Sequence, residues 1–377
     1  MLLDHAKVLL ELEHISSNIF KDISDEFNQA QAIWQTIAHN ELFLSAVQNS
    51  DFDIPLSEWH GEIGQYYAVD ANNIKSKTLV AVDGSQIYPD RHQGSTCFLI
   101  NVGSVVISYG IEGRKVLLES KPIVFDGDDE LSTRGSIIDV VNCRREEHEF
   151  LTGVSIMSKL KQACIPDEHL LLLFDGSLIF WHLDSKDSML RLEFLSRYCA
   201  SLDALYKLQV PYAGYISVPR NKDLVNLLRF AVQEGFFKEN IHVLMDHILD
   251  VHVCSFFLEP YTRSTVFKHK SKLSLSYPEP IQPHFFYLHV GSEIARIEIP
   301  AWIAADEELV DAVAGMILDN SLKGRGYPVV LAESHEQAVV KGPDRDFFYH
   351  LIQKIGLDKH RHIALSQKSV KKRGIGI

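Results

Sequence analysis

The chain has 377 residues and a formal net charge of −13, and 46% of its residues are hydrophobic. These totals are typical of a globular protein with one large domain and appendages. The negative charge excludes a protein that coats nucleic acid through its overall charge, but not one with a local basic groove. No apolar stretch is long enough to span a membrane, and acids interrupt the apolar N-terminus. We therefore expect an intracellular, cytoplasmic protein without a signal peptide.

The spacing of apolar residues predicts the elements along the chain. Helical spacing predicts a helical arm over residues 1–50, and a polar connecting segment follows over 51–76. Residues 78–125 are rich in Val, Ile and Leu and are divided by Gly and polar clusters, which predicts hairpin-linked strands. Farther on, the pattern predicts helices over 136–164, 186–208, 221–234, 306–320 and 334–340, and strands over 169–175, 210–218 and 284–302.

Hairpin strands followed by alternating helices and strands predict a mixed α/β sheet flanked by helices. We expect three parts along the chain. Residues 1–76 form the helical arm and connecting segment, residues 77–342 form the main α/β domain, and residues 343–377 form a C-terminal helix and a basic tail.

Two apolar strands run into the same tripeptide, which is Asp83-Gly-Ser in the first strand and Asp175-Gly-Ser in the second. Functional groups of α/β sheets gather at the carboxyl ends of strands, and a Gly there permits a sharp turn or a close approach. The two aspartates are 92 residues apart, which leaves room for two further strands and a crossover helix. They are therefore candidates for adjacent parallel strands with converging carboxylates. Each copy alone is also explained as an ordinary turn, since Asp and Gly are common turn residues.

Two converging carboxylates repel each other unless one is protonated or a cation bridges them. Mg²⁺ and Mn²⁺ are hard ions that prefer oxygen ligands. A pair of such ions about 4 Å apart stabilises both the attacking and the leaving oxygen in phosphodiester cleavage. The paired aspartates therefore point to metal-dependent hydrolysis.

The chain resembles the NurA nuclease family in an ordered set of motifs: "AVDGSQI", "LLLFDGSL", an Arg/Glu-rich helix between them, and "GYPVVLAESHEQAVV". The resemblance covers about residues 78–342, and the stretches "EIARIEIPAWIA" and "GYPVVLAESHEQAV" look like the bacterial branch of the family. It implies an RNase H-like core, a homodimer, and Mn²⁺- or Mg²⁺-dependent cleavage of single-stranded DNA and duplex ends. It also implies 5′-to-3′ exonuclease and single-strand endonuclease activities. The implied partner is a HerA-type hexameric ATPase that acts in DNA end resection and double-strand-break repair.

The resemblance assigns roles to individual residues. Metal ligation is implied for Asp83, Glu149, Asp175 and His335, and Glu149 is chosen because it follows Arg145 at the family spacing. Glu146 lies on the same helix face as Glu149 and is the second choice for the helix ligand. Without the resemblance, His335 would be an ordinary surface residue of a helix.

Further roles are implied around the third strand and beyond it. Arg220 is expected to hold a phosphate, although this chain has Val218-Pro219-Arg220 where many family members have a Ser-Lys pair. Asp246, placed with Asp250 on an expected helix, is a candidate further metal ligand. Arg263 and Ser264 match an Arg-Ser pair that would contact DNA, whereas Tyr287 and Tyr327 are interpreted mainly as packing groups.

Alternative functions were weighed against the same residues. A DNA-end binding or clamp subunit with a decayed nuclease site remains open. An aspartyl-phosphate enzyme would need an Asp two residues after its nucleophile, where this chain has Ser85 and Ser177. No GxxxxGK[ST] motif occurs, so an ATP-driven motor would have to be a partner.

Overall fold

The fold is known from a computed structural model, which describes residues 3–19, 21–50, 54, 56–90, 96–110, 113–127, 136–163, 168–238 and 245–358. The run Lys371-Lys372-Arg373 of the expected basic tail lies outside these residues. Within the described part of the chain, no helix is both long and apolar enough to cross a bilayer.

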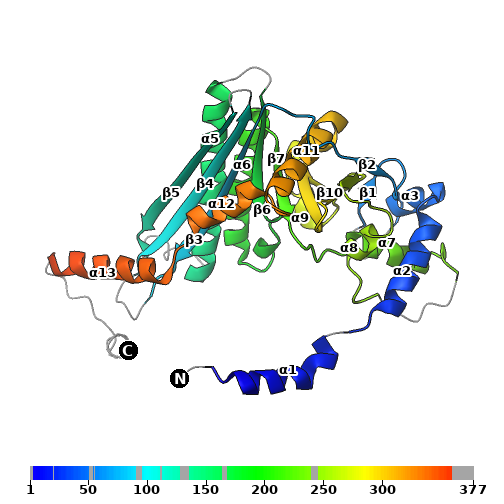
Figure 1. The fold of residues 1–377 in the computed structure, drawn as a ribbon, viewed down its shortest axis with the longest axis horizontal. Helices are drawn as coiled ribbons and strands as arrows, with labels where there is room; N and C mark the ends of the chain where they lie inside the picture. The colour runs from blue at the N-terminus through cyan, green and yellow to red at the C-terminus, as the bar shows by residue number, and fades with distance from the viewer. Residues whose placement is uncertain are drawn as a thin grey trace.

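The described residues form an 11-stranded sheet in the order β1-β9-β10-β11-β7-β6-β3-β4-β5, and β8 joins both β2 and β10 (Figure 1). The strands are β1 (Glu58–Trp59), β2 (Tyr66–Ala68), β3 (Lys77–Ile87), β4 (Phe98–Gly110), β5 (Gly113–Phe125), β6 (His169–Asp175), β7 (Tyr212–Ile216), β8 (Thr262–Ser264), β9 (Phe267–Lys268), β10 (Pro283–His289) and β11 (Ile294–Pro300). The expected mixed sheet is confirmed. Its RNase H-like assignment stays a prediction.

The centre of the sheet is parallel, and its two sides are antiparallel. β3 pairs with β6 and β6 pairs with β7 in parallel register, whereas β3-β4-β5 is a meander of long hairpins. A parallel pair needs a crossover connection, and the helix α5 (Ile137–Ala163) supplies it between β5 and β6. The chain between the two Asp-Gly-Ser segments therefore contains the two strands and the helix expected from their separation.

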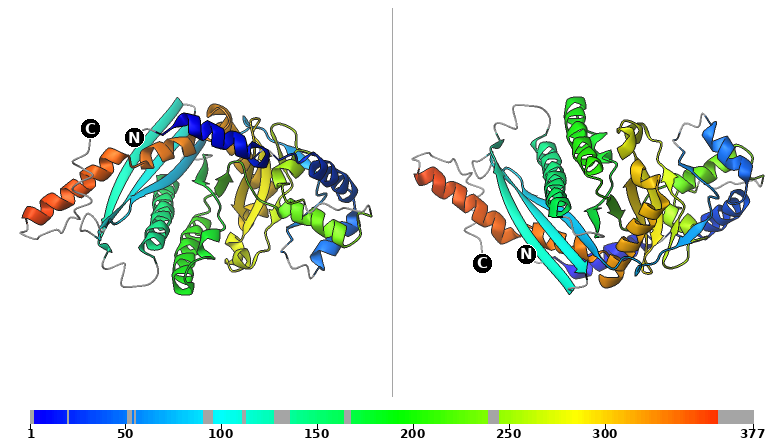
Figure 2. Two further views of the ribbon diagram at one scale, coloured as in Figure 1. Left: turned by 90° about the horizontal axis from the view of Figure 1, so that it is seen from below. Right: turned by 90° about the horizontal axis from the view of Figure 1, so that it is seen from above.

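Helices cover both faces of the sheet (Figure 2). One face carries α5 and α6 (Ser188–Lys207), and the opposite face carries α11 (Glu307–Lys323) and α12 (Val329–Ala338). Alternate residues of each strand point to opposite faces of the sheet. Val80 and Val82 of β3 pack with α5, whereas Leu79 and Ala81 pack with α11 and α12. The parallel strands are therefore apolar on both faces, which explains their continuous hydrophobic sequences.

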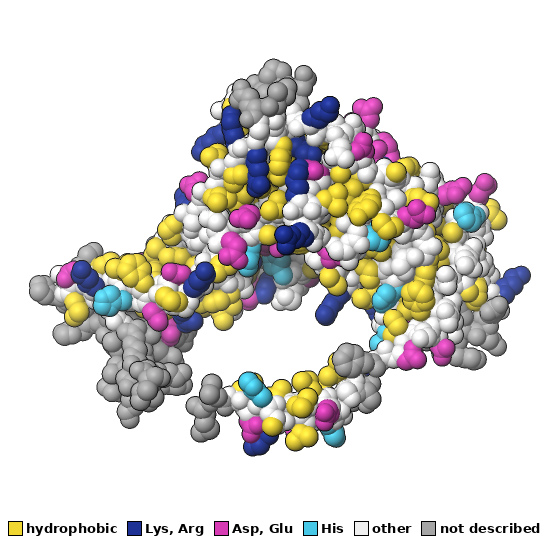
Figure 3. Space-filling view, viewed as in Figure 1, with side chains coloured by type: hydrophobic (Ala, Val, Ile, Leu, Met, Phe, Trp, Pro, Cys, Tyr) yellow, Lys and Arg dark blue, Asp and Glu magenta, His cyan; other side chains and the backbone are white. Residues whose placement is uncertain are grey.

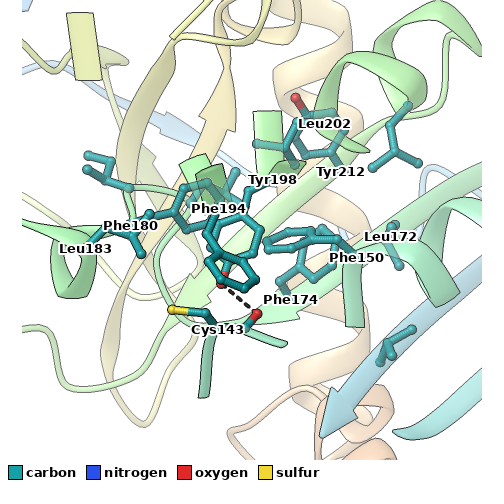
Figure 4. Close-up of a cluster of buried hydrophobic side chains, with 14 of the residues drawn as sticks. Cys143, Phe150, Leu172, Phe174, Phe180, Leu183, Phe194, Tyr198, Leu202 and Tyr212 are labelled. Atoms are coloured by element: carbon teal, nitrogen blue, oxygen red, sulfur yellow. Dashed lines mark hydrogen bonds between the residues drawn. The ribbon is translucent and has the colours of Figure 1, made fainter. Parts of the chain in front are cut away.

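An aromatic cluster joins α5, α6 and the segment after β6 (Figure 4). The rings of Phe150 and Phe174 lie 4.7 Å apart, and those of Phe180 and Tyr198 are equally close. The buried hydroxyl of Tyr198 donates a hydrogen bond of 2.8 Å to the carbonyl of Cys143. This packing holds α5 against β6 next to Asp175.

The expected N-terminal helical arm consists of three helices, α1 (His5–Ile19), α2 (Ser24–Ile37) and α3 (Glu41–Gln48). α2 and α3 pack against α7 (Asp223–Gln233), and α2 also contacts α8 (Asp250–Cys254), whereas α1 lies apart from the body (Figure 1). The connecting segment that follows contributes β1 and β2 to the sheet.

The remaining helical elements of the described residues connect strands or follow the main domain. They are the 3₁₀ turns η2 (Trp181–Leu183) and η3 (Glu279–Ile281), α9 (Lys272–Leu275), α10 (Ala301–Ala304) and α13 (Gly342–Asp358), of which α13 is long and extends from the body.

Candidate active site beside the parallel strands

The parallel register brings the two aspartates together. Pairing of β3 with β6 runs from Lys77 opposite His169 to Ala81 opposite Leu173. Two residues farther along both strands, Asp83 and Asp175 occupy equivalent positions. Their side chains therefore lie side by side and on the same face of the sheet.

The expectation that Asp83 ends its strand is wrong. β3 continues to Ile87, because its other neighbour, β4, still pairs with it there through Leu99. Only the ladder to β6 stops before Asp83. Asp175 is the last residue of β6, as expected. The site therefore lies where one strand has lost its parallel neighbour, not where both strands end.

Asp83 and Asp175 face α12. The Nδ1 atom of His335 lies 2.9 Å from Oδ2 of Asp83, and the backbone N–H of Gly84 donates to Oδ1 of Asp83 at 2.7 Å. The hydroxyl of Tyr327, in the loop before α12, is hydrogen-bonded to Asp175. Each aspartate thus has one polar partner from the segment containing α12. The interpretation of Tyr327 as a packing group missed this contact, although its position eight residues before His335 was visible in the sequence.

Glu149 reaches the site from the other side of the sheet, on α5. Its Oε1 atom pairs with Nη1 of Arg145 at 2.7 Å, and the same guanidinium donates to the carbonyl of Gly84 at 3.2 Å. A Cβ atom at Gly84 would lie 2.7 Å from Cγ of Arg145 and would also overlap Glu149. Only glycine at this position lets α5 bring its carboxylate so close to β3.

A cavity of about 290 Å³ joins these groups. It opens at the place where the β3–β6 ladder stops, so side chains from both faces of the sheet reach it. Its lining residues are Val82, Asp83, Arg145, Glu146, Glu149, Phe150, Phe174, Asp175, Gly176, Ser177, Ile179, Trp181 and His182.

The cavity has more carboxylates than positively charged side chains to neutralise them. Burial raises the pKa of Glu149 to about 8; Arg145 acts to lower it, while Glu146, Asp83 and Asp175 add to the rise. Partial burial also raises the pKa of Asp175; the Tyr327 hydroxyl opposes the rise and Asp83 adds to it. Such mutual repulsion is relieved by a proton or by a bound cation.

The donor chemistry of this cavity fits a hard divalent ion, since its four carboxylates outnumber its two cationic side chains, Arg145 and His182. Among the described residues, however, no group of three or more His, Cys, Asp and Glu side chains is assembled as a metal site. The ion pairs account for this, because Arg145 engages Glu149 and His335 engages Asp83. Asp83 and Asp175 are the residues that would hold an ion, and Glu149 could join after release from Arg145.

Glu146, the second choice for the helix ligand, has a partner of its own. Its Oε2 atom lies 3.0 Å from Nε2 of His182. Burial acts to lower the pKa of His182, but its hydrogen bonds to Cys143 and Glu146 raise it to about 9. The imidazole is therefore positively charged near neutral pH, and Glu146 is neutralised by it.

Hydrogen bonds to the buried Glu298 hold the turn after Asp175 in place. Gly176 has a φ of 130°, a conformation open to glycine. The hydroxyl of Ser177 and the N–H of Leu178 both donate to Oε2 of Glu298 at 2.8 Å. Glu298 is fully buried on β11, where Nε of Arg296 donates to its other oxygen at 2.9 Å.

Three expected site residues do not line the cavity: His335, which contacts Asp83 from α12, and also Asp246 and Arg220. Asp246 is not on a helix with Asp250, because α8 begins only at Asp250. Its carboxylate pairs with Arg229 at 3.1 Å, and its carbonyl accepts from Lys222. Arg220 is exposed in the loop between β7 and α7. The roles expected for Asp246 and Arg220 stay predictions.

The expected DNA contacts of Arg263 and Ser264 are also wrong. Both residues are fully buried in β8. The guanidinium of Arg263 pairs with Glu307 and Asp311 of α11, which satisfies its charge inside the domain. Tyr287 is a packing group as predicted, since it is buried and hydrogen-bonded to Asp250 at 2.6 Å.

Comparison with known proteins decides the family. Residues 77–340 match the family model described as the NurA domain. The chain belongs to the NurA family. Within this family, no finding bears out the bacterial branch suggested by the closing stretches, and no curated protein matches the sequence.

Solved NurA structures resemble the chain at low sequence identity. One crystal structure of NurA has 10% identity and a TM-score of 0.40, covering 83% of this chain and 94% of that chain. A NurA structure with manganese has 13% identity and a TM-score of 0.41, covering 92% and 98%. A NurA structure bound to dAMP and manganese has 12% identity and a TM-score of 0.41, covering 90% and 94%.

The raised pKa of Glu149 predicts a pH-dependent stability of this NurA chain in EDTA. Between pH 4.5 and about 8, the folded state keeps a proton that the unfolded chain has released. The free energy of unfolding should therefore fall as the pH rises through this window, by at most about 1.4 kcal/mol per pH unit from this group. Denaturant titrations across the window measure it.

Glu149→Gln should flatten that profile and stabilise the metal-free protein near pH 8, because the amide never ionises. Glu234→Gln, an exposed surface change at the end of α7, is the matched control and should leave the profile unchanged. An identical slope in wild type and Glu149→Gln would show that Glu149 does not carry the proton.

Proposed function

We propose that this NurA family member is a divalent-metal-dependent DNA nuclease with 5′-to-3′ exonuclease and single-strand endonuclease activities, acting in DNA end resection and double-strand-break repair. The single observation that carries the proposal is the meeting of Asp83, Asp175 and Glu149 at one cavity. NurA crystal structures with manganese, and with dAMP and manganese, support the ion and a substrate made of nucleotides.

In this proposal the ion would supply the metal chemistry, and side chains of the protein would position the reacting groups. A bound Mn²⁺ or Mg²⁺ would polarise the scissile phosphate and lower the pKa of a water molecule. Asp83 and Asp175 would supply its oxygen ligands, and Glu149 would add a third carboxylate. Tyr327 orients Asp175 by donating a hydrogen bond to it.

His335 is suited to moving a proton. Its side chain is 62% exposed while its Nδ1 atom contacts Asp83. The ring therefore reaches solvent on one side and a carboxylate of the site on the other, so it can exchange a proton with water while it orients Asp83.

The test is cleavage of end-labelled linear and single-stranded DNA with Mn²⁺, Mg²⁺ or EDTA. Wild type should cut only with metal, and Asp83→Asn and Asp175→Asn should each slow cutting at least about 100-fold, because the ion supplies several kcal/mol of transition-state stabilisation. Asp184→Asn is the control, since Asp184 is half-exposed, pairs with Arg191 and does not line the cavity. The position of the label in the products gives the polarity of cutting.

A DNA-end clamp with a decayed nuclease site is the second candidate. The Arg145–Glu149 ion pair favours it, because a guanidinium occupies the position next to a carboxylate that a cation would take. Binding of DNA by wild type without cutting, under every metal and with a motor partner present, would replace the nuclease proposal with the clamp.

We further propose that the protein acts as a homodimer. Large apolar side chains are exposed on three elements that bury few of them: Leu9, Leu10 and Leu12 of α1, Leu117 and Val124 of β5, and Phe347, Ile355 and Leu357 of α13 (Figure 3). Within the described part of the chain, β5 pairs only with β4 and is therefore an edge strand of the sheet. A second copy of the chain would cover these groups.

Light scattering tests this assembly. Wild type should have the mass of two chains, and the double change Leu117→Glu with Phe347→Glu should reduce it to one, because charges would be buried without partners. Leu42→Glu, on an exposed position of α3, should leave the mass unchanged. A wild-type mass of one chain would contradict the dimer.

We also propose a HerA-type hexameric ATPase as the partner. The net charge of −13 disfavours free binding to DNA, and the chain has no P-loop of its own. Delivery of DNA by a motor should therefore speed cutting by about tenfold or more through a higher effective concentration. Degradation rates with and without the ATPase and ATP measure this, and a motor with its P-loop Lys replaced is the control. Equal rates for the isolated protein and the complex would contradict the partnership.

A further inference from the structure

Trp181 differs from its neighbours on the segment that follows Asp175. Phe180 and Leu183 are buried in the aromatic cluster of α5 and α6, whereas 42% of the surface of Trp181 is exposed. The Trp181 side chain lines the same cavity as Asp83, Glu149 and Asp175. A large aromatic ring therefore stands at the opening of the candidate active site and contributes little to the core.

The backbone below this ring is firmly anchored. Glu298 holds the start of the segment through Ser177 and Leu178. The hydroxyl of Tyr277 accepts from the N–H of Phe180 at 3.1 Å and donates to the carbonyl of Leu178 at 3.0 Å. The position of Trp181 is thus set before any ligand arrives, which lowers the cost of binding to it.

Among the described residues, the indole has an edge contact with the ring of His269. The ring of His269 lies 5.3 Å away at 72°, an edge-on arrangement that leaves much of the indole uncovered. His269 is buried, and its ring nitrogens contact Ser274 at 3.2 Å and Asp223 at 3.3 Å. A buried histidine with two polar partners is a rigid support for an exposed ring.

We propose that the indole of Trp181 is a stacking platform for an unpaired nucleobase next to the scissile phosphate, so that the cavity takes a single strand. This inference rests on the proposed nuclease function and adds a residue that positions its single-stranded substrate. A base can stack on a protein ring only when a neighbouring base has left that face, which favours single strands over duplex. Stacking is indifferent to sequence, because every base has a π-face.

The charge of the protein makes such a contact important. With a net charge of −13 and several carboxylates in the cavity, attraction to phosphates is weak outside the bound ion. Stacking does not depend on net charge. It therefore supplies affinity in a place where electrostatics do not.

Fluorescence gives a readout that is independent of cutting. Trp34 and Trp59 are buried and Trp302 is partly buried, so Trp181 is the most exposed indole. With Ca²⁺ as a hard cation for the carboxylates, oligothymidine should quench the emission of the full-length protein, and a blunt hairpin duplex of equal length should quench it much less. Trp181→Phe should remove the quenching.

Kinetics test the same contact during cutting with Mn²⁺. Trp181→Ala should raise KM for single-stranded DNA by about 5- to 100-fold, equivalent to about 1–3 kcal/mol at 1.4 kcal/mol per factor of ten, with kcat changed little. Trp181→Phe should restore most of the loss, because phenylalanine also stacks. Tyr66→Ala, which truncates an aromatic ring of similar exposure outside the cavity, is the control.

Abasic substrates make the assignment specific. One abasic position near the cut should raise the KM of wild type by the same factor. The KM of Trp181→Ala should not change when that base is removed. If wild type cuts DNA but Trp181→Ala behaves like Tyr66→Ala, the platform is wrong and the nuclease stands. Quenching by single strands without any cutting would support the platform and overturn the nuclease, and neither quenching nor cutting would overturn both.

Discussion

The repulsion between two neighbouring carboxylates organises this structure. The parallel pairing of β3 and β6 places Asp83 and Asp175 at equivalent positions of neighbouring strands, so their side chains lie side by side. Each of the surrounding contacts then reduces the cost of that arrangement. His335 faces one carboxylate, Tyr327 donates to the other, and Arg145 holds the third acid, Glu149, from the opposite face.

The two Asp-Gly-Ser segments differ in the contacts that their Gly and Ser residues make. In the first copy, glycine admits the side chains of α5, and Ser85 donates to the carbonyl of Ala338 at the end of α12. In the second copy, glycine adopts a positive φ, and Ser177 is bound by the buried Glu298. In both copies the aspartate lines the cavity, the glycine provides space or freedom, and the serine fixes a neighbouring segment. A turn alone would not need all three functions.

Much of the sheet could be predicted from local patterns. The hairpins, the crossover helix and the adjacency of Asp83 and Asp175 follow from apolar runs and from the length of chain between them. What remained hidden depends on pairing between distant segments. Asp83 lies inside its strand because β4 pairs farther along β3 than β6 does. Arg263 looked like a free cation in sequence, but its carboxylate partners are on α11, more than forty residues away. Tyr327 showed no pattern that distinguished it from a core residue.

The short link between α12 and α13 has a mechanical consequence. Only residues 339–341 separate the helix that carries His335 from the long helix that extends away from the body. α12 has ten residues, and Ser85 and Asn101 both donate to the carbonyl of Ala338 at its C-terminal end, next to this link. This hydrogen-bonded end lies between His335 and α13, so the start of the outer helix is tied to the same element that holds the imidazole beside Asp83.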